Sequence, residues 1–196
     1  MNDIEINWLQ TSLAQFAATT PSTDAAQHAT TVLAFVTSAS RPWSRATRAG
    51  HLTASAWVLD RTRSHAALIH HAKLNRWLQP GGHIDDADAS WRAAAQREVA
   101  EEIGLADFIA QPGDDDLFDV DVHPIPARAD EPAHFHYDLR FLLVVDVDAT
   151  VEGKLMINTD EAHDCRWFAL SELANDLTME PSMRRMIRLS ASLDLN

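Results

Sequence analysis

The segment from Arg97 to Leu105 restricts the fold of this chain more than any other. It reads Arg-Glu-Val-Ala-Glu-Glu-Ile-Gly-Leu, so Glu98, Glu101 and Glu102 stand at positions i, i+3 and i+4. On a helix, this spacing places three carboxylates on one side, within about a third of the circumference. Like charges this close repel by roughly 0.2–0.5 kcal/mol per pair. Divalent cations with a preference for oxygen are the natural partners, so the segment predicts a metal-binding helix.

This segment resembles the Nudix box, the signature of the Nudix hydrolase family. The family pattern is Gly, five residues, Glu, seven residues, then Arg-Glu-apolar-x-Glu-Glu-x-Gly-apolar. Gly82 takes the first position, and residues 97–105 match the second half without a substitution. There are two departures: Asp88 stands in place of the first Glu, and eight residues rather than seven separate it from Arg97. The first Glu of the pattern is mostly structural, so we expect intact chemistry and an enlarged loop. A weaker likeness continues to Trp167 and covers residues 51–170.

The resemblance implies an α/β fold, a Nudix-type α/β/α sandwich with a mixed sheet. It also implies a hydrolase acting on acid anhydrides, which cleaves a phosphoanhydride in a nucleoside diphosphate linked to another moiety or in a similar small phosphorylated metabolite. The implied cofactor is Mg²⁺ or Mn²⁺. Its ligands would be the carboxylates of Glu98, Glu101 and Glu102 and the carbonyl oxygen of Gly81.

Further roles follow from the same pattern and from the chemistry that hydrolysis needs. Arg97 is expected to pair with a box glutamate, since Glu101 lies four residues on. A general base must deprotonate the attacking water, and Glu98, Glu102 and Glu161 all stay open for that role. Glu161 lies six residues before Trp167, which matches an extra glutamate of several Nudix enzymes.

Hydrophobic periodicity divides the chain into a helical N-terminal extension, residues 1–45, and a Nudix domain, residues 46–196. Apolar residues recur at helical spacing in residues 4–40, with a break at residues 19–22. We expect a helical pair that packs on the main domain; the alternatives are a lid or a surface for a homodimer. The box helix should begin after Ser90 and end at Gly104. Strands are predicted at residues 51–59, 66–71, 76–78, 117–122, 135–147 and 165–169, followed by a helix capped by Ser171 and a last helix from Pro181 to Leu189.

The net charge and the cysteine content limit the partners and the location. A formal charge of −13 argues against nucleic acid and anionic membranes as partners, because both attract basic patches. It is compatible with a small phosphorylated substrate, since bound metal ions reverse the local sign. No run of eighteen apolar residues and no basic leader is present. The single Cys165 excludes an intrachain disulfide, so a cytoplasmic location is expected.

A second polar pattern lies in the long strand predicted at residues 135–147. His134, His136, Asp138 and Arg140 alternate with apolar residues, so they share one strand face, while residues 135, 137, 139 and 141 pack on the other. The row could line the substrate pocket or consist of hydrogen-bonded structural residues. Zinc binding by the two histidines is a third hypothesis that lacks a clear third ligand. His123 lies in a stiff segment and could reach the same cleft, and His83 is the histidine nearest the expected metals.

Two alternative functions remain at this stage. The first is a Nudix-fold ligand-binding or sensor protein without hydrolysis, which would normally show a degraded box or an added DNA-binding domain. The second is an isoprenoid diphosphate isomerase, a class that relies on a reactive Cys and Glu in the pocket. Cys165 lies in an Arg-Trp strand rather than in a pocket loop, which disfavours the isomerase.

Overall fold

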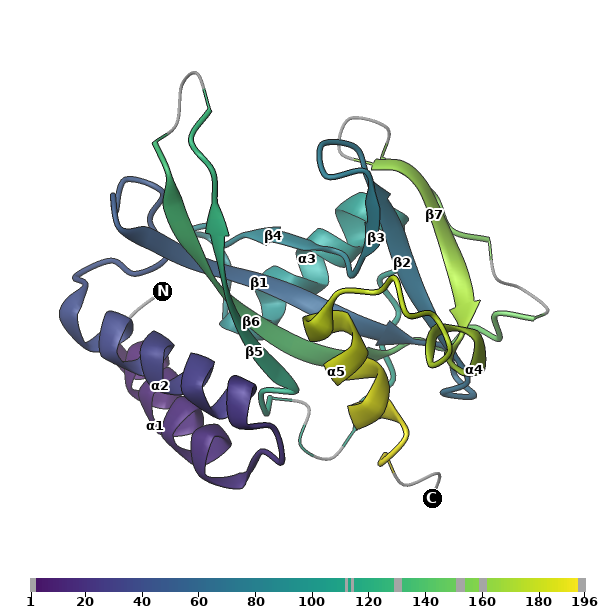
Figure 1. Ribbon diagram of the computed structural model, residues 1–196, viewed down its shortest axis with the longest axis horizontal. Helices are drawn as coiled ribbons and strands as arrows, with labels where there is room; N and C mark the ends of the chain where they lie inside the picture. The colour runs from purple at the N-terminus through teal and green to yellow at the C-terminus, as the bar shows by residue number, and fades with distance from the viewer. Residues whose placement is uncertain are drawn as a thin grey trace.

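One mixed sheet organises the described part of the chain (Figure 1). The computed structural model describes residues 3–111, 113, 115–128, 132–150, 154–158 and 162–193. The helices in these ranges are α1 (Asp3–Thr19), α2 (Thr23–Ser38), α3 (Trp91–Ile103), α4 (Leu170–Leu173) and α5 (Pro181–Ser190). The strands are β1 (Gly50–Leu59), β2 (His65–His71), β3 (Arg76–Leu78), β4 (Gly81–His83), β5 (Asp119–Ile125), β6 (His134–Val144) and β7 (Ala162–Ala169).

Strand β1 is the centre of the sheet. The strand order is β3-β2-β1-β6-β5, with β4 added to β1 and β7 added to β2. Strands β1 and β6 run parallel from Gly50↔Phe135 to Leu59↔Val144, whereas the other pairings are antiparallel. Every residue of β1 is buried, as expected for a strand covered on both faces.

Two hydrophobic clusters cover the two faces of the sheet. Behind the sheet in Figure 1, α3 packs on side chains such as Ala54 of β1 and Leu139 of β6. In front of it, Met183 and Met186 of α5 pack on Trp57 of β1 and its neighbours. The mixed sheet between helices confirms the predicted Nudix-type α/β fold.

The predicted N-terminal helical pair is present. Ser22 caps α2, since its Oγ accepts a hydrogen bond from the backbone N–H of Ala25 at 3.3 Å. The pair shares its core with the sheet and with α3: Phe35 stacks on Tyr137 of β6 with ring centroids 4.2 Å apart. None of the described helices has the length and apolar character needed to span a bilayer. The division at residues 45 and 46 remains a prediction.

The ends of the box helix lie where the sequence places them. Ser90 is the N-cap of α3, and its Oγ accepts from the backbone N–H of Ala93 at 3.1 Å. Gly104 ends the helix with φ of +73°, the left-handed conformation that glycine adopts without steric cost.

Other expectations at element ends are wrong. Ser171 lies inside α4, whose N-cap is Ala169 with no side-chain hydrogen bond. Strand β6 ends at Val144 rather than residue 147, because the chain bends at Asp146. Phe135 was expected to pack but is 45% exposed.

Strand β5 runs to Ile125, beyond the predicted end at residue 122, and includes Pro124. Since β5 is at the edge of the sheet order, a proline without an N–H is tolerated there.

Candidate functional site

Gly81 and Gly82 hold the buried glutamates of α3 against β4. The backbone N–H of Gly81 donates to Glu102 Oε2 at 2.8 Å. Gly81 has φ of +152°, and a Cβ there would lie 2.2 Å from Ser55 Cβ. A Cβ on Gly82 would lie 2.7 Å from Glu98 Oε2. Position 81 therefore requires glycine, because of its positive φ and its close approach to β1. A side chain at position 82 would displace the Glu98 carboxylate.

Arg97 connects the loop before α3 to the box glutamates. Its Nε and Nη2 donate to the two oxygens of Asp88, each at 3.0 Å, and its Nη1 donates to Glu98 at 2.9 Å. The expected pair with Glu101 is present at 3.2 Å. Its Nη2 also donates to the carbonyl oxygen of His83 at 2.8 Å. The hydrogen bonds to Asp88 are the largest cause of a raised Arg97 pKa, so the guanidinium stays charged.

Asp88, the replacement for the first box glutamate, is almost fully buried at 7% side-chain exposure. Burial opposes its ionisation. The hydrogen bonds from Arg97 and from the backbone N–H of Asp85 outweigh that effect and lower the Asp88 pKa. The enlarged loop forms a turn in which the Asp88 N–H donates to the Asp85 carbonyl oxygen at 3.1 Å.

The three box glutamates differ in exposure. Glu98 is 8% and Glu102 4% exposed, whereas the side chain of Glu101 is 54% exposed. Two buried carboxylates on one side of a helix form an oxygen-only donor set, which fits Mg²⁺ or Mn²⁺. Glu161 lies outside the described residues, so its proposed role stays a prediction.

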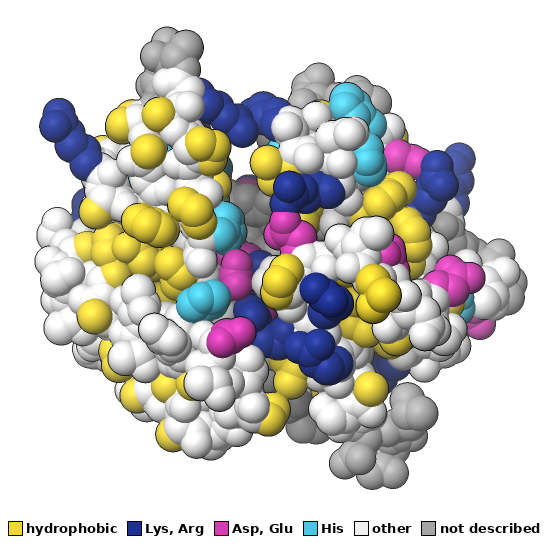
Figure 2. All heavy atoms as spheres, in the orientation of Figure 1, with side chains coloured by type: hydrophobic (Ala, Val, Ile, Leu, Met, Phe, Trp, Pro, Cys, Tyr) yellow, Lys and Arg dark blue, Asp and Glu magenta, His cyan; other side chains and the backbone are white. Residues whose placement is uncertain are grey.

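The polar face of β6 continues across the neighbouring strands. Pairing registers place polar side chains next to one another on β1, β6 and β5. Read in that order, the rows are His51–His136–His123, Thr53–Asp138–Asp121 and Ser55–Arg140–Asp119. Figure 2 shows histidine, acidic and basic side chains gathered around a hollow near the middle of this view.

The charged rows form a buried ionic network. Arg140 is 3% exposed and contacts Asp138 at 2.8 Å, Asp119 at 3.1 Å and Asp121 at 3.3 Å. Burial opposes its charge, but the three carboxylates raise the Arg140 pKa. Arg185 of α5 joins from outside the sheet, with Nε 2.7 Å from Asp119. Such a network fixes α5 on this face, since each buried charge depends on its partners.

Asp138 takes part in this network rather than facing solvent. One carboxylate oxygen accepts from Thr53 at 3.0 Å, and the other accepts from Ser55 and Arg140, each at 2.8 Å. These contacts are what a structural role requires. The pocket role predicted for Asp138 is untested.

The histidine row contains more residues than the sequence pattern predicts. The ring centroid of His136 lies 4.8 Å from His51, 5.2 Å from His134, 5.5 Å from His123 and 5.6 Å from His83. Burial, followed by the charges of these four histidines, lowers the His136 pKa to about 2, so its imidazole is neutral at physiological pH. His51 was not among the residues predicted from the sequence, because only its register with β6 places it in this row.

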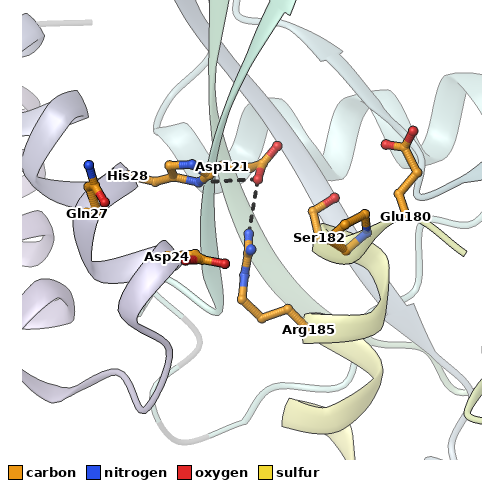
Figure 3. Close-up of a pocket in the computed structure, with 8 residues that line it drawn as sticks. Asp24, Gln27, His28, Asp121, Glu180, Ser182 and Arg185 are labelled. Carbon is orange, nitrogen blue, oxygen red and sulfur yellow. Dashed lines mark hydrogen bonds and ion pairs between the residues drawn. The ribbon is translucent and has the colours of Figure 1, made fainter.

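A pocket of about 260 Å³ adjoins the ionic network between α2, β5 and α5 (Figure 3). Asp121 of β5 contacts both helices that line the pocket: His28 of α2 lies at 3.3 Å and Arg185 of α5 at 3.1 Å. Asp121 also contacts His123 at 3.1 Å, so the pocket is linked to the histidine row.

The chain is similar to known proteins in sequence and in structure. A family model described as "NUDIX domain" matches residues 50–190. No curated protein matches the chain. The NUDIX domain of Shewanella oneidensis NrtR, solved with ADP ribose, is 18% identical with a TM-score of 0.50, covering 75% of this chain and 90% of that chain.

Two further solved structures are similar. A NUDIX-family hydrolase from Clostridium perfringens is 21% identical with a TM-score of 0.49, covering 72% of this chain and 96% of that chain. A C. elegans Ap4A hydrolase binary complex is 14% identical with a TM-score of 0.46, covering 71% and 94%. At these identities the likeness concerns the fold alone.

Proposed function

This chain belongs to the NUDIX domain family, and we propose that it is a metal-dependent pyrophosphohydrolase. Family membership supports a hydrolase acting on phosphorus-containing anhydrides. The proposed substrate class is a nucleoside diphosphate linked to another moiety, or a similar small phosphorylated metabolite. One observation carries the proposal: the carboxylates of Glu98 and Glu102 are both buried, the first beside Gly82 and the second hydrogen-bonded to the Gly81 N–H.

Glu98, Glu101, Glu102 and the carbonyl oxygen of Gly81 would hold Mg²⁺ or Mn²⁺. The chemistry supplied by a bound cation is neutralisation of phosphate charge and a lowered pKa of the attacking water. Arg97 holds the Glu98 carboxylate through its 2.9 Å contact, which limits that side chain to one orientation.

The proposed reaction joins a water oxygen to phosphorus and breaks the bridging P–O bond. The water proton passes to a carboxylate, for which Glu98, Glu102 and Glu161 remain the candidates. The departing phosphate keeps the electrons of the broken bond. A site of carboxylates in a chain of net charge −13 depends on cations to accept this anionic substrate.

The two alternative functions find less support. A reactive thiol, which the isomerase would need, is disfavoured because burial and then the charge of Asp164 raise the Cys165 pKa. A binding protein without hydrolysis needs no intact box. In this chain, however, residues 97–105 keep all three glutamates of the family pattern. A cytoplasmic location, and a homodimer formed through the helical pair, remain further proposals.

The test is a panel of nucleoside diphosphate derivatives incubated with Mg²⁺ or Mn²⁺, with phosphate release measured after phosphatase treatment. The panel should contain ADP ribose and Ap4A, the ligand types that two similar structures name. We expect the wild type to cleave at least one compound and the double variant Glu98→Gln/Glu102→Gln to cleave none measurably. Calorimetric binding of a compound that is never cleaved would support the binding protein instead.

A further inference from the structure

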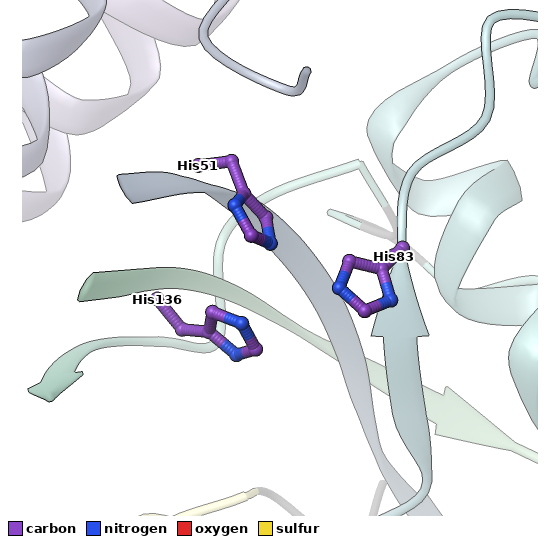
Figure 4. Close-up of side chains that lie close together, drawn as sticks. All are labelled: His51, His83 and His136. Atoms are coloured by element: carbon purple, nitrogen blue, oxygen red, sulfur yellow. The ribbon is translucent and has the colours of Figure 1, made fainter. Parts of the chain in front are cut away.

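Three histidines from three strands converge beside the box. In the described part of the chain, His51 of β1, His83 of β4 and His136 of β6 form a group whose ligand atoms all lie within 4.8 Å of one another. Figure 4 shows the three rings turned toward a common space. His51 is 1% exposed, and the other two are half-buried. The group is therefore largely shielded from water but not sealed.

The strand pairings hold these side chains in place. His51 is paired with His136 in the parallel ladder, and His83 is paired with Thr53, two residues along β1. A fourth ring, His134, stacks on His51 with centroids 5.1 Å apart and an interplanar angle of 23°. Side chains on paired strands are positioned more accurately than side chains on loops.

We propose that His51, His83 and His136 form a binding site for a transition-metal cation of the Zn²⁺ type, distinct from the carboxylate site of the box. Imidazole nitrogens suit Zn²⁺, Cu²⁺, Ni²⁺ and Fe²⁺, whereas Mg²⁺ and Mn²⁺ are better served by oxygen ligands. A tetrahedral ion with Zn–N bonds of about 2.0–2.1 Å needs ligand nitrogens about 3.3 Å apart. The ligand atoms lie within 4.8 Å of one another, so ion binding requires them to move closer by up to about 1.5 Å.

The number of ligands indicates what such an ion could do. Three protein ligands leave one position of a tetrahedral zinc ion open for water or for an anionic oxygen. The site is also connected to the box, because the His83 carbonyl oxygen accepts the hydrogen bond from Arg97 Nη2 at 2.8 Å. A cation here would restrain β4 at the point where Gly81 and Gly82 meet the box glutamates.

The test uses the full chain after chelation and dialysis, with excess Mg²⁺ present to fill the carboxylate site. Co²⁺ is titrated and followed by its visible absorption, and Zn²⁺ affinity is measured by displacing the Co²⁺. Variants His83→Gln and His136→Gln remove one ligand each. The variant His163→Gln removes an exposed histidine of β7 and is the matched control.

We expect one equivalent of Co²⁺ to bind to the wild type, to His163→Gln and to Glu98→Gln/Glu102→Gln. Loss of either ligand should weaken binding at least about a hundredfold, since loss of a group that merely supports a ligand costs 10–100-fold. Circular dichroism of the metal-free variants checks that they remain folded. Since His51 is fully buried, a His51→Gln variant could fail to fold. The variants His83→Gln and His136→Gln, at half-buried positions, therefore test the site without it.

Three results would overturn the proposal. One is the absence of Co²⁺ binding in the wild type, which would mean that the rings only pack against each other. Another is unchanged Co²⁺ affinity in both His83→Gln and His136→Gln. The last is loss of the Co²⁺ spectrum in Glu98→Gln/Glu102→Gln, which would assign the ion to the box. None of these readouts depends on hydrolysis, so they can refute the histidine site without affecting the proposed hydrolase function.

Discussion

Arg97 holds Asp88 through two parallel hydrogen bonds, Nε to Oδ1 and Nη2 to Oδ2, both 3.0 Å long. This bidentate geometry is the strongest form of the Arg–carboxylate pair. The shorter Asp side chain thus keeps the contact to Arg97 from a loop that is one residue longer than the family pattern.

Asp88→Asn should lower turnover by about 10–100-fold, the range seen when partners of metal-binding side chains are lost. The physical reason is that Arg97, without its bidentate pair to the Asp88 carboxylate, would hold Glu98 less firmly. Steady-state kinetics and the melting temperature measure the two effects. Asp86→Asn in the same loop is the control: its carboxylate is 69% exposed and pairs with Arg41 and Trp43 outside the box, so turnover should stay near that of the wild type. Equal turnover in both variants would contradict the role of Asp88.

Glu98→Gln and Glu102→Gln should each reduce turnover at least about a hundredfold, because each removes a charged ligand and preserves shape. Glu101→Gln should have a smaller effect, since Glu101 is the exposed member of the three. Folding should survive, as repulsion on α3 is relieved. Near-normal turnover in the first two variants would remove the metal assignment of the box.

Chelation should abolish hydrolysis, and addition of Mg²⁺ or Mn²⁺ should restore it. Ca²⁺ should restore it less, because its larger and more flexible coordination shell positions a water molecule poorly. Initial rates at matched free cation concentrations provide the comparison. Full turnover without any divalent cation would indicate another mechanism.

The Asp121 carboxylate should make stability depend on pH at the acid end. Burial opposes its ionisation, but the contacts from His123 and His28 and the charge of Arg140 lower its pKa far below the usual value. The ionised form is therefore favoured by folding. Its contribution is complete above the unfolded pKa, about 3.9, and decreases as the pH falls below that value.

Asp121→Asn should accordingly destabilise the protein at pH 7 by about 3–5 kcal/mol, the usual cost of breaking a buried ion pair. The difference from wild type should shrink below pH 4. Urea unfolding at pH 7, 4.5 and 3 measures it, with Asp146→Asn as a control, because an exposed pair such as Asp146–Arg61 contributes about 0–1 kcal/mol. A difference that grows on acidification would mean that folding favours the protonated form of Asp121.

Removal of residues 1–45 should reduce solubility and the melting temperature, because α1 and α2 share a core with the sheet. The Trp91 indole of α3 would also lose its 3.1 Å hydrogen bond to the Glu5 carbonyl oxygen. Mg²⁺ binding should persist in the folded fraction, since no proposed ligand lies in the removed segment. Complete loss of Mg²⁺ binding in a folded truncation would mean that the extension helps to build the site.

Local signals account for what the sequence predicted well. Ser90 and Gly104 mark the ends of α3 through interactions within one helical turn, so no tertiary information is needed. The alternation along β6 likewise placed His136, Asp138 and Arg140 on one face, because side chains on a strand repeat every two residues.

Pairings between distant segments explain what the sequence could not predict. Residues 81–83 have little intrinsic strand preference, and they form β4 because β1 pairs with them. His51 joins His136 only through the register of a parallel ladder, which no local pattern specifies. Ser171 is not the expected cap because α4 begins two residues earlier than predicted, at Leu170, with Ala169 as its N-cap.

The parallel ladder between β1 and β6 also determines when this protein can fold. Thr53 and Asp138, neighbours in that ladder, are 85 residues apart in the chain. Contacts of this separation slow folding, since a long loop must close before they form. During synthesis, β1 stays without its central partner until residues 134–144 leave the ribosome. Until then one edge of β1 has no partner strand, and unpaired strand edges promote aggregation of incompletely folded chains.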